Sequence, residues 1–238
     1  MERIVVPSGE FDWRTAQIFA AQALCRPGSV FSFATGDTTG GVFAELVRLR
    51  EELNIDFSRT RAVNLDEYVG VEKDDPAGCY YRILHSLYRP LGIAEDRFYV
   101  PVTSAAGAEE ECRRFTRTLK DWGGIDLMLL SIGRNGHIAF NEPGTPFGTE
   151  IHVAALSSST IEAKTPLFGG SEKVPRCGIT MGISTVMQAR RIVLAARGAH
   201  KKDIIRAVLE GPVTETVPAS VLRLHPCLSV ILDEAAAG

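Results

Sequence analysis

Short apolar runs rich in β-branched residues alternate with helix-period patterns along nearly the whole 238-residue chain, and this alternation is the strongest constraint on its fold. The run at residues 125–130 is almost entirely apolar, which is typical of a strand buried on both faces of a parallel sheet. In the second helical pattern, Val42, Leu46, Leu49 and Leu53 recur at the spacing of one helix face. Strands that alternate with helices predict an α/β fold: a doubly wound, mostly parallel sheet with helices on both faces, Rossmann-like.

The same periodicity places the individual elements. We expect strands at Ile4–Val6, Ser29–Ala34, Arg61–Leu65, Phe98–Val100, Ile125–Ile132, His152–Ala155, Arg191–Ala196 and Leu228–Leu232. We expect helices at Asp12–Leu24, Gly41–Leu53, Ala77–Leu91, Ala106–Trp122, Ser184–Gln188 and His200–Glu210. No repeat, low-complexity stretch or linker interrupts the pattern, so we expect residues 1–238 to form a single domain.

Charge and cysteine content exclude several classes of protein. The 26 basic and 29 acidic residues give a formal charge of −3 without a basic cluster, which argues against a nucleic-acid partner. Apolar runs are too short to cross a bilayer, and the first ten residues contain no apolar core of a signal peptide, so we expect no membrane association. The cysteines are odd in number, scattered and without a CxxC pair, which favours reduced thiols in a cytoplasmic protein over disulfides or a metal site; they are Cys25, Cys79, Cys112, Cys177 and Cys227.

Ligands of doubly wound folds bind beyond the carboxyl ends of the strands, so segments that directly follow strands are the candidate sites. The first is Thr35-Gly36-Asp37-Thr38-Thr39, followed by Gly40-Gly41 and a helix. Its glycines, hydroxyls and helix N-terminus predict a cradle for an anion. It is neither a Walker A loop nor GxGxxG, and a tight turn with a helix cap has the same pattern.

The second segment, residues 64–70, reads NLDEYVG and follows the third predicted strand. Two adjacent carboxylates, Asp66 and Glu67, suit a general base at the mouth of a site. Acids that cap the next helix are the alternative, and the segment alone does not separate the two.

The third segment, residues 131–144, follows the most apolar strand and is the most specific. His137 is surrounded by glycines, so its imidazole can reach a ligand that bulkier neighbours would block. Glu142, five residues later, can hold the tautomer of this imidazole or stabilise its charged form. A single loop histidine is often structural, but the glycines, the amides and the strand-end position favour a functional role.

Together these segments resemble the glucosamine-6-phosphate deaminase (isomerase) family, part of the wider group that also holds the 6-phosphogluconolactonases. Residues 35–39 are similar to the family's TGGTP phosphate loop, residues 66–70 match DEYVG, and residues 135–144 differ by one residue from DGHIAFNEPG. The lactonase branch is similar in the GxxxGH part but lacks the DEYVG and FNEPG signatures. The chain therefore resembles the deaminase branch over nearly its whole length.

The resemblance implies that a hexosamine 6-phosphate is converted into a ketose 6-phosphate and ammonia without a metal, nucleotide or other cofactor. His137 would open the sugar ring, and Glu142 would orient and stabilise the imidazole. Asp66 would take the proton from C2 and return it at C1, while Glu67 would be structural. The 35–39 loop (Thr35, Gly36, Asp37, Thr38 and Thr39) and Lys201 would hold the phosphate.

Two departures from the family affect the site. Asn135 stands where the family has Asp before the Gly-His pair. Its amide can accept a hydrogen bond from the imidazole but carries no charge, which would weaken support of the charged form by about 1–2 kcal/mol. Pro166 stands where the family has an arginine for the phosphate. Lys164 and Arg176 are the two cations that could replace this arginine, and a different sugar phosphate is the alternative.

A third departure concerns assembly: His152 and Ala154 stand where hexameric relatives have cations for an allosteric activator. We therefore expect an unregulated monomer or small homo-oligomer whose partner is a small-molecule sugar phosphate. Glucosamine 6-phosphate and galactosamine 6-phosphate differ at one hydroxyl and are not separated by the sequence. A 6-phosphogluconolactonase-like hydrolase and a non-catalytic sugar-phosphate sensor are the alternative functions.

Overall fold

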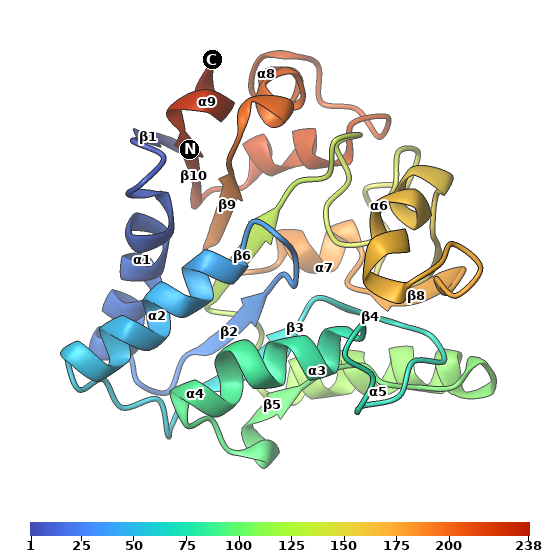
Figure 1. The fold of residues 1–238 in the computed structure, drawn as a ribbon, viewed down its shortest axis with the longest axis horizontal. Coiled ribbons are helices and arrows are strands. Elements are labelled where there is room, and N and C mark those ends of the chain that lie inside the picture. Colours follow the sequence, from blue (N-terminus) through green and yellow to red (C-terminus); the bar gives the residue numbers. More distant parts are fainter.

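The computed structural model describes residues 1–238, and a seven-stranded sheet lies at its centre, with every neighbouring pair of strands parallel. The strand order is β1-β10-β9-β6-β2-β3-β5 (Figure 1). The strands are β1 (Glu2–Val6), β2 (Val30–Phe33), β3 (Arg61–Asn64), β5 (Phe98–Tyr99), β6 (Leu127–Ser131), β9 (Ile192–Ala196) and β10 (Leu228–Asp233).

Successive side chains of each strand point to opposite faces, and each face has its own set of helices. Phe31 and Phe33 of β2 pack with α1, α2 and the α3–α4 segment, whereas Met128 and Leu130 of β6 pack with α5, α7 and α8 on the other face. This two-sided covering confirms the predicted fold class. The helices are α1 (Phe11–Cys25), α2 (Gly40–Glu52), α3 (Cys79–Ile83), α4 (Arg89–Leu91), α5 (Ala108–Asp121), α6 (Ser158–Phe168), α7 (Ile183–Met187), α8 (Lys202–Glu210) and α9 (Glu234–Ala237).

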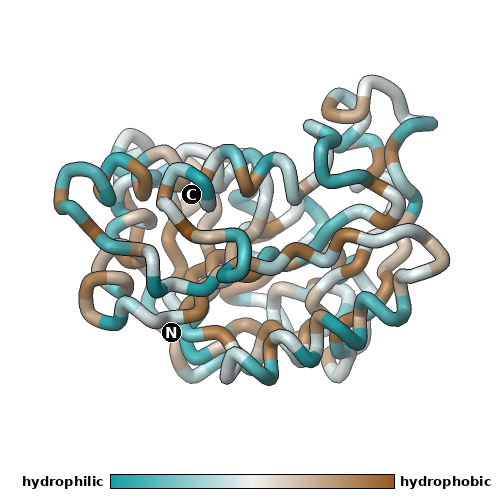
Figure 2. The backbone as a smooth tube through the Cα atoms, turned by 90° about the horizontal axis from the view of Figure 1, so that it is seen from below, coloured by the Kyte–Doolittle hydropathy of each residue, from teal (hydrophilic) through white to brown (hydrophobic).

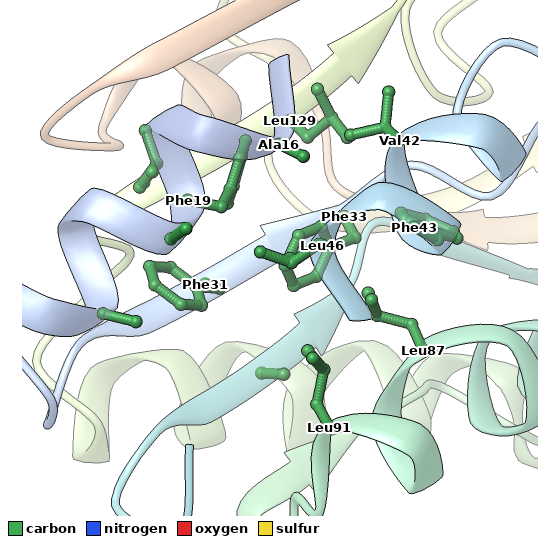
Figure 3. Packing of buried hydrophobic residues seen from close by; sticks show 14 of the residues in the cluster. Ala16, Phe19, Phe31, Phe33, Val42, Phe43, Leu46, Leu87, Leu91 and Leu129 are labelled. Carbon is green, nitrogen blue, oxygen red and sulfur yellow. The ribbon is translucent and has the colours of Figure 1, made fainter. Parts of the chain in front are cut away.

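Aromatic rings fill much of the layer between β2 and the first two helices (Figure 3). The ring of Phe19 from α1 lies 5.1 Å from that of Phe33, and Phe43 from α2 meets Phe33 edge-on at 5.8 Å. Such ring pairs add about 0.5–1.5 kcal/mol each beyond the burial of their apolar area. Figure 2 shows the apolar strands running through the middle of the molecule with more polar helices outside. This packing fixes the sheet whose strand ends carry the candidate segments.

A second, three-stranded antiparallel sheet of order β4-β8-β7 lies beside the main one. Its strands are β4 (Asp66–Tyr68), β7 (His152–Ala155) and β8 (Cys177–Thr180). The sequence predicted β7 but neither its partners nor the separate sheet, because β4 and β8 are only three and four residues long and carry acids or a glycine. Tyr68 and Phe140 pack with this sheet, and α6 joins it through Phe168.

The helix expected at Ala77–Leu91 is present but changes its pitch. Between α3 and α4, residues Leu84–Tyr88 form a π-helical turn in which the Arg89 N–H donates to the Leu84 carbonyl, five residues earlier. Pro90 follows and has no N–H to extend the regular ladder. The other predicted helices and strands occur within a few residues of their expected bounds. No helix of the structure is both long and apolar enough to span a membrane.

Candidate active site

A cavity of about 790 Å³ opens at the carboxyl ends of β2, β3, β6 and β9 and is closed on one side by α6. Most of the site residues predicted from the sequence line it: Thr35, Gly36, Asp37, Thr38, Asp66, Asn135, His137 and Lys201. Thr39 and Glu142 do not line the cavity and instead support residues that do. The structure therefore brings all three strand-end segments to one place.

Asp66 is the most deeply buried carboxyl group in the cavity wall. It is 7% exposed, and its only side-chain hydrogen bond comes from the Cys79 thiol, whose Sγ lies 3.8 Å from Oδ1. Burial, aided by the negative charge of Glu67, raises the pKa of Asp66 to about 7, although the positive charge of Lys164 and the thiol oppose this rise. A carboxylate with a pKa near the working pH suits a general base.

Glu67, the adjacent acid, is not available as a general base, because backbone N–H groups occupy both of its oxygens. Its Oε1 accepts hydrogen bonds from the backbone N–H groups of Tyr68 and Cys79 at 2.7 and 3.0 Å, and its Oε2 accepts one from Tyr80 at 2.6 Å. Two of these donors are the first N–H groups of α3, which have no partner inside the helix. Glu67 is therefore a helix cap, in agreement with the structural role that we expected for it.

His137 lies in the loop after β6, and the glycine at position 133 makes room for its imidazole. A Cβ atom on Gly133 would lie 2.3–2.5 Å from three atoms of the ring. The Gly133 N–H also donates to the His137 carbonyl at 2.9 Å, which closes the loop. The glycine is required here by a close approach, and the imidazole is held at the cavity wall.

Glu142 stands behind His137 and is held from several sides. Its Oε2 lies 3.5 Å from Nδ1 of His137 and accepts a hydrogen bond from Nδ2 of Asn135 at 2.8 Å. Its Oε1 accepts one from the Thr160 hydroxyl at 2.5 Å. Burial alone would raise the pKa of Glu142, but the imidazole, the hydroxyl and the amide outweigh it and lower the pKa to about 2. Glu142 is therefore a permanent anion beside the imidazole.

Asn135 does not contact the imidazole, contrary to our expectation. Its Oδ1 accepts a hydrogen bond from the backbone N–H of His137 at 3.2 Å, and its Nδ2 donates to Glu142. Gly136, with a φ of +88°, makes the turn between Asn135 and His137, and the Asn135 amide joins the backbone of this turn to Glu142. Asn135 thus acts on His137 through the backbone and through the position of Glu142.

Two hydrogen bonds through Asn64 link the 35–39 loop to Asp66. The Thr35 hydroxyl donates to Oδ1 of Asn64 at 2.9 Å, and Nδ2 of Asn64 donates to the carbonyl of Asp66 at 2.7 Å. Thr39 is fully buried, and its hydroxyl contacts the backbone of Ala34 and Gly36. Thr39 therefore shapes the loop, and the first four residues of the loop face the cavity.

Cations gather at the other side of the cavity. Lys201 donates from Nζ to the carbonyl of Ile132 at 2.5 Å, and burial together with the charges of Arg134 and Lys164 lowers its pKa. Of the two cations that could replace the arginine missing at Pro166, Lys164 lines the cavity and Arg176 does not. Three further cations or titratable side chains line the cavity and were not predicted: Arg134, Arg197 and His200. Arg197 is the first residue after β9, so its position at a strand end was the signal that could have found it.

The arrangement can move protons at two points without a metal. It offers a carboxyl poised near pH 7, an imidazole backed by a permanent anion, and a cationic end that suits a phosphate. No group of three or more His, Cys, Asp or Glu side chains is placed to hold a metal ion.

A family model matches residues 17–229, most of the chain, and describes glucosamine-6-phosphate isomerases and 6-phosphogluconolactonases. The chain belongs to this family. Its relatives include a glucosamine-6-phosphate deaminase of Lachnoclostridium phytofermentans, 44% identical over 218 residues that cover 92% of each chain. A glucosamine-6-phosphate deaminase of Thermoanaerobacter pseudethanolicus is 39% identical over 234 residues, 98% of this chain and 92% of the relative.

Solved structures of the family show the same architecture. A monomeric glucosamine-6-phosphate deaminase superposes with a TM-score of 0.96 at 36% identity, covering 100% of this chain and 99% of that one. The 6-phosphogluconolactonase of Trypanosoma brucei has a TM-score of 0.78 at 19% identity, covering 99% and 97%, which shows a shared fold only.

Proposed function

We propose that this chain converts a hexosamine 6-phosphate into a ketose 6-phosphate and ammonia. The observation that carries the proposal is the pair of acids that flank the cavity, Asp66 at the start of β4 and Glu142 in the loop after β6. Asp66 has a pKa of about 7 and Glu142 one of about 2. An aldose–ketose shift needs one group that gains and loses a proton and a separate proton carrier for the ring oxygen, and this pair with His137 supplies both.

The reaction proceeds in three steps, and each proton that is released has an acceptor. His137 takes the proton of the C1 hydroxyl and delivers it to the ring oxygen as the C1–O5 bond breaks, so the pyranose opens to the aldehyde, and the anion Glu142 stabilises the charged imidazole between the two transfers. Asp66 then moves the proton from C2 to C1 while O1 gains a proton that the amino group gives up, which converts the amino aldehyde into a C2 imine. Water adds to C2, and ammonia leaves to give the ketone.

Glucosamine 6-phosphate is the substrate that we propose, because the relatives at 39–44% identity are named for it. Galactosamine 6-phosphate remains the competing epimer. We also propose a monomer, as the solved deaminase with a TM-score of 0.96 is described. A cytoplasmic location is supported by five cysteines that are all free thiols.

The lactonase alternative is less well supported by the site. Hydrolysis of a lactone requires no proton transfer between carbon atoms, so it gives no role to a buried carboxyl such as Asp66. Six solved structures of similar fold that are described as 6-phosphogluconolactonases are 15–19% identical to this chain. A sensor that only binds a sugar phosphate would need the cavity and its cations. It would not need an acid with a pKa near 7 such as Asp66, so this alternative is also less well supported.

One assay separates these functions. The protein is incubated with glucosamine 6-phosphate, galactosamine 6-phosphate and 6-phosphogluconolactone, and the release of ammonia, ketose 6-phosphate and acid is followed. We expect equal amounts of ammonia and ketose 6-phosphate from glucosamine 6-phosphate. Acid release from the lactone without ammonia from either amino sugar would contradict the proposal. Tight binding of a hexosamine 6-phosphate without turnover would identify a sensor.

A further inference from the structure

Arg197 is the first residue after β9, and its side chain lines the cavity. Neither the proton transfers nor the support of the imidazole uses it. The arginine expected on α6 is absent, because Pro166 stands in its place. Helix α6 therefore contributes no guanidinium to the cavity, and the segment after β9 contributes one.

The contacts of Arg197 fix its direction. Its Nη1 donates to Oδ1 and Oδ2 of Asp12 at 3.1 and 2.9 Å, and the guanidinium carbon lies 5.4 Å from the ring centre of Phe11. The Nε and Nη2 atoms form no hydrogen bond within the protein, and the side chain is 39% exposed. One side of the fork is thus anchored, and three N–H donors are left for a ligand.

The ion pair between Arg197 and Asp12 lies next to the helix that follows the 35–39 loop, the proposed phosphate loop. A Cβ atom built on Gly41 would lie 2.3 Å from Oδ2 of Asp12, so the carboxylate rests on the first turn of α2. The N-terminus of this 13-residue helix follows the 35–39 loop directly. Lys201, four residues after Arg197, lines the same cavity. Two cations, the 35–39 loop and a helix N-terminus therefore converge, as they do in phosphate sites.

We propose that Arg197 contacts the phosphate of the substrate through its free guanidinium donors and performs the role of the arginine that is absent at Pro166. The inference rests on the proposed function, since it assigns the phosphate end of the same cavity. Lys164 is the competing cation. Its charge acts on both Asp66 and Lys201, whereas Arg197 is tied through Asp12 to the helix that follows the 35–39 loop.

The test compares Arg197→Met with a matched control, Arg190→Met. Arg190 lies just before the opposite end of β9 and also forms an ion pair, with Nη1 3.1 Å from Oδ1 of Asp126. We expect Arg197→Met to raise KM for the hexosamine 6-phosphate by roughly 10–100-fold, as expected for the loss of a charge-assisted contact, and to change kcat much less. The inhibition constant of inorganic phosphate should rise by a similar factor. Arg190→Met should leave both values unchanged.

A second variant keeps the test decisive if Arg197→Met does not fold. Arg197→Lys retains the charge, but an ammonium group cannot contact Asp12 and a phosphate with the geometry of a fork. We expect an intermediate rise in both constants. Unchanged KM and unchanged phosphate inhibition in a folded Arg197 variant would overturn the inference, as would a Lys164→Met variant that alone carried the whole effect.

The proposed function and this inference can fail separately. If the parent protein turns over no hexosamine 6-phosphate, the function fails, and calorimetric titration with inorganic phosphate still tests Arg197. Phosphate binding that is weaker in Arg197→Met than in the parent and in Arg190→Met would support the inference even then. Equal binding by all three proteins would overturn it.

Discussion

Two segments that meet at the cavity, residues 66–70 and residues 135–144, shift the pKa of their carboxyl groups in opposite directions. Asp66 is 7% exposed and has one weak side-chain donor, the Cys79 thiol, so its pKa rises to about 7. Glu142 is also largely covered, but its oxygens contact an imidazole, an amide and a hydroxyl, so its pKa falls to about 2. Burial favours the neutral form of both acids; the donors around Glu142 reverse this effect, and the single thiol beside Asp66 does not.

The two pKa values differ because different hydrogen-bond donors surround the two acids. In the 66–70 segment the neighbouring acid, Glu67, takes the backbone donors at the start of α3 and leaves none for Asp66. In the 135–144 segment, Asn135 and the α6 residue Thr160 both direct donors at Glu142. The 66–70 segment therefore carries an acid that can accept a proton near pH 7, and the 135–144 segment carries an acid that stays ionised.

The strongest way to break the comparison is to remove the titrating acid. Asp66→Asn keeps the size of the side chain but cannot accept a proton from C2. We expect kcat to fall by 10²–10⁴-fold, the usual cost of losing a general base. Steady-state assays of ammonia release measure this. Retention of more than a tenth of the parental kcat would show that another group is the base.

A second variant disturbs the other loop through its backbone. Gly133→Ala places a methyl group within 2.3–2.5 Å of the His137 ring, so the imidazole must move. A displacement of about 1 Å costs roughly 10²-fold in rate, and we expect a fall in kcat of that order. Gly28→Ala is the control, because a Cβ there meets no atom within 4 Å. Equal kcat values for the two variants would mean that the position of His137 does not matter.

The third prediction concerns stability and follows from the raised pKa of Asp66. The carboxyl binds its proton more tightly in the folded state, where the pKa is about 7, than in the unfolded chain, where it is 3.8. Its ionisation therefore destabilises the fold increasingly as the pH rises from about 4 to 7. Asp66→Asn should raise the Tm at pH 8 by roughly 4–8 °C, or ~2 kcal/mol. At pH 4 the gain should disappear in thermal unfolding scans. A gain that is independent of pH would contradict the raised pKa.

The smallest expected effect comes from giving the His137 loop a second acid. In Asn135→Asp a carboxylate replaces the donor 2.8 Å from Oε2 of Glu142 and adds negative charge beside the imidazole. The charged imidazolium is then favoured, and the acidic limb of kcat/KM should move by roughly one pH unit or less. Superimposable pH profiles of parent and variant would show that residue 135 has no electrostatic influence on the site.

The sequence predicted the main sheet well because its signals are local. Apolar runs such as residues 125–130 and one-sided helices such as α2 repeat at fixed periods. The small antiparallel sheet was not predicted, because β4 and β8 pair across more than a hundred residues and are too short to show a period. The helix α6 was also absent from the expected elements, although Ser157 caps it and Gly169 ends it, because Pro166 interrupts its pattern.

For the site residues, too, the sequence predicted what depends on local signals and not what depends on contacts between distant residues. Asp66, His137 and Lys201 could be predicted to share a site because each follows a strand of one parallel sheet. The direction of the Asn135 side chain could not, because it depends on the turn at Gly136 and on Glu142 seven residues away. Arg197 required the structure for its partner, since Asp12 lies 185 residues earlier in the chain.

The central claim is that Asp66 carries the proton between C2 and C1 while Glu142 remains charged, and isotope exchange tests it most directly. The ketose 6-phosphate is incubated in D₂O with the parent, with Asp66→Asn and with Glu142→Gln, and deuterium at C1 is followed by proton NMR; no deamination is needed. We predict exchange by the parent, reduced but measurable exchange by Glu142→Gln, and none above background by Asp66→Asn. Exchange by Asp66→Asn at a rate close to that of the parent would contradict the account.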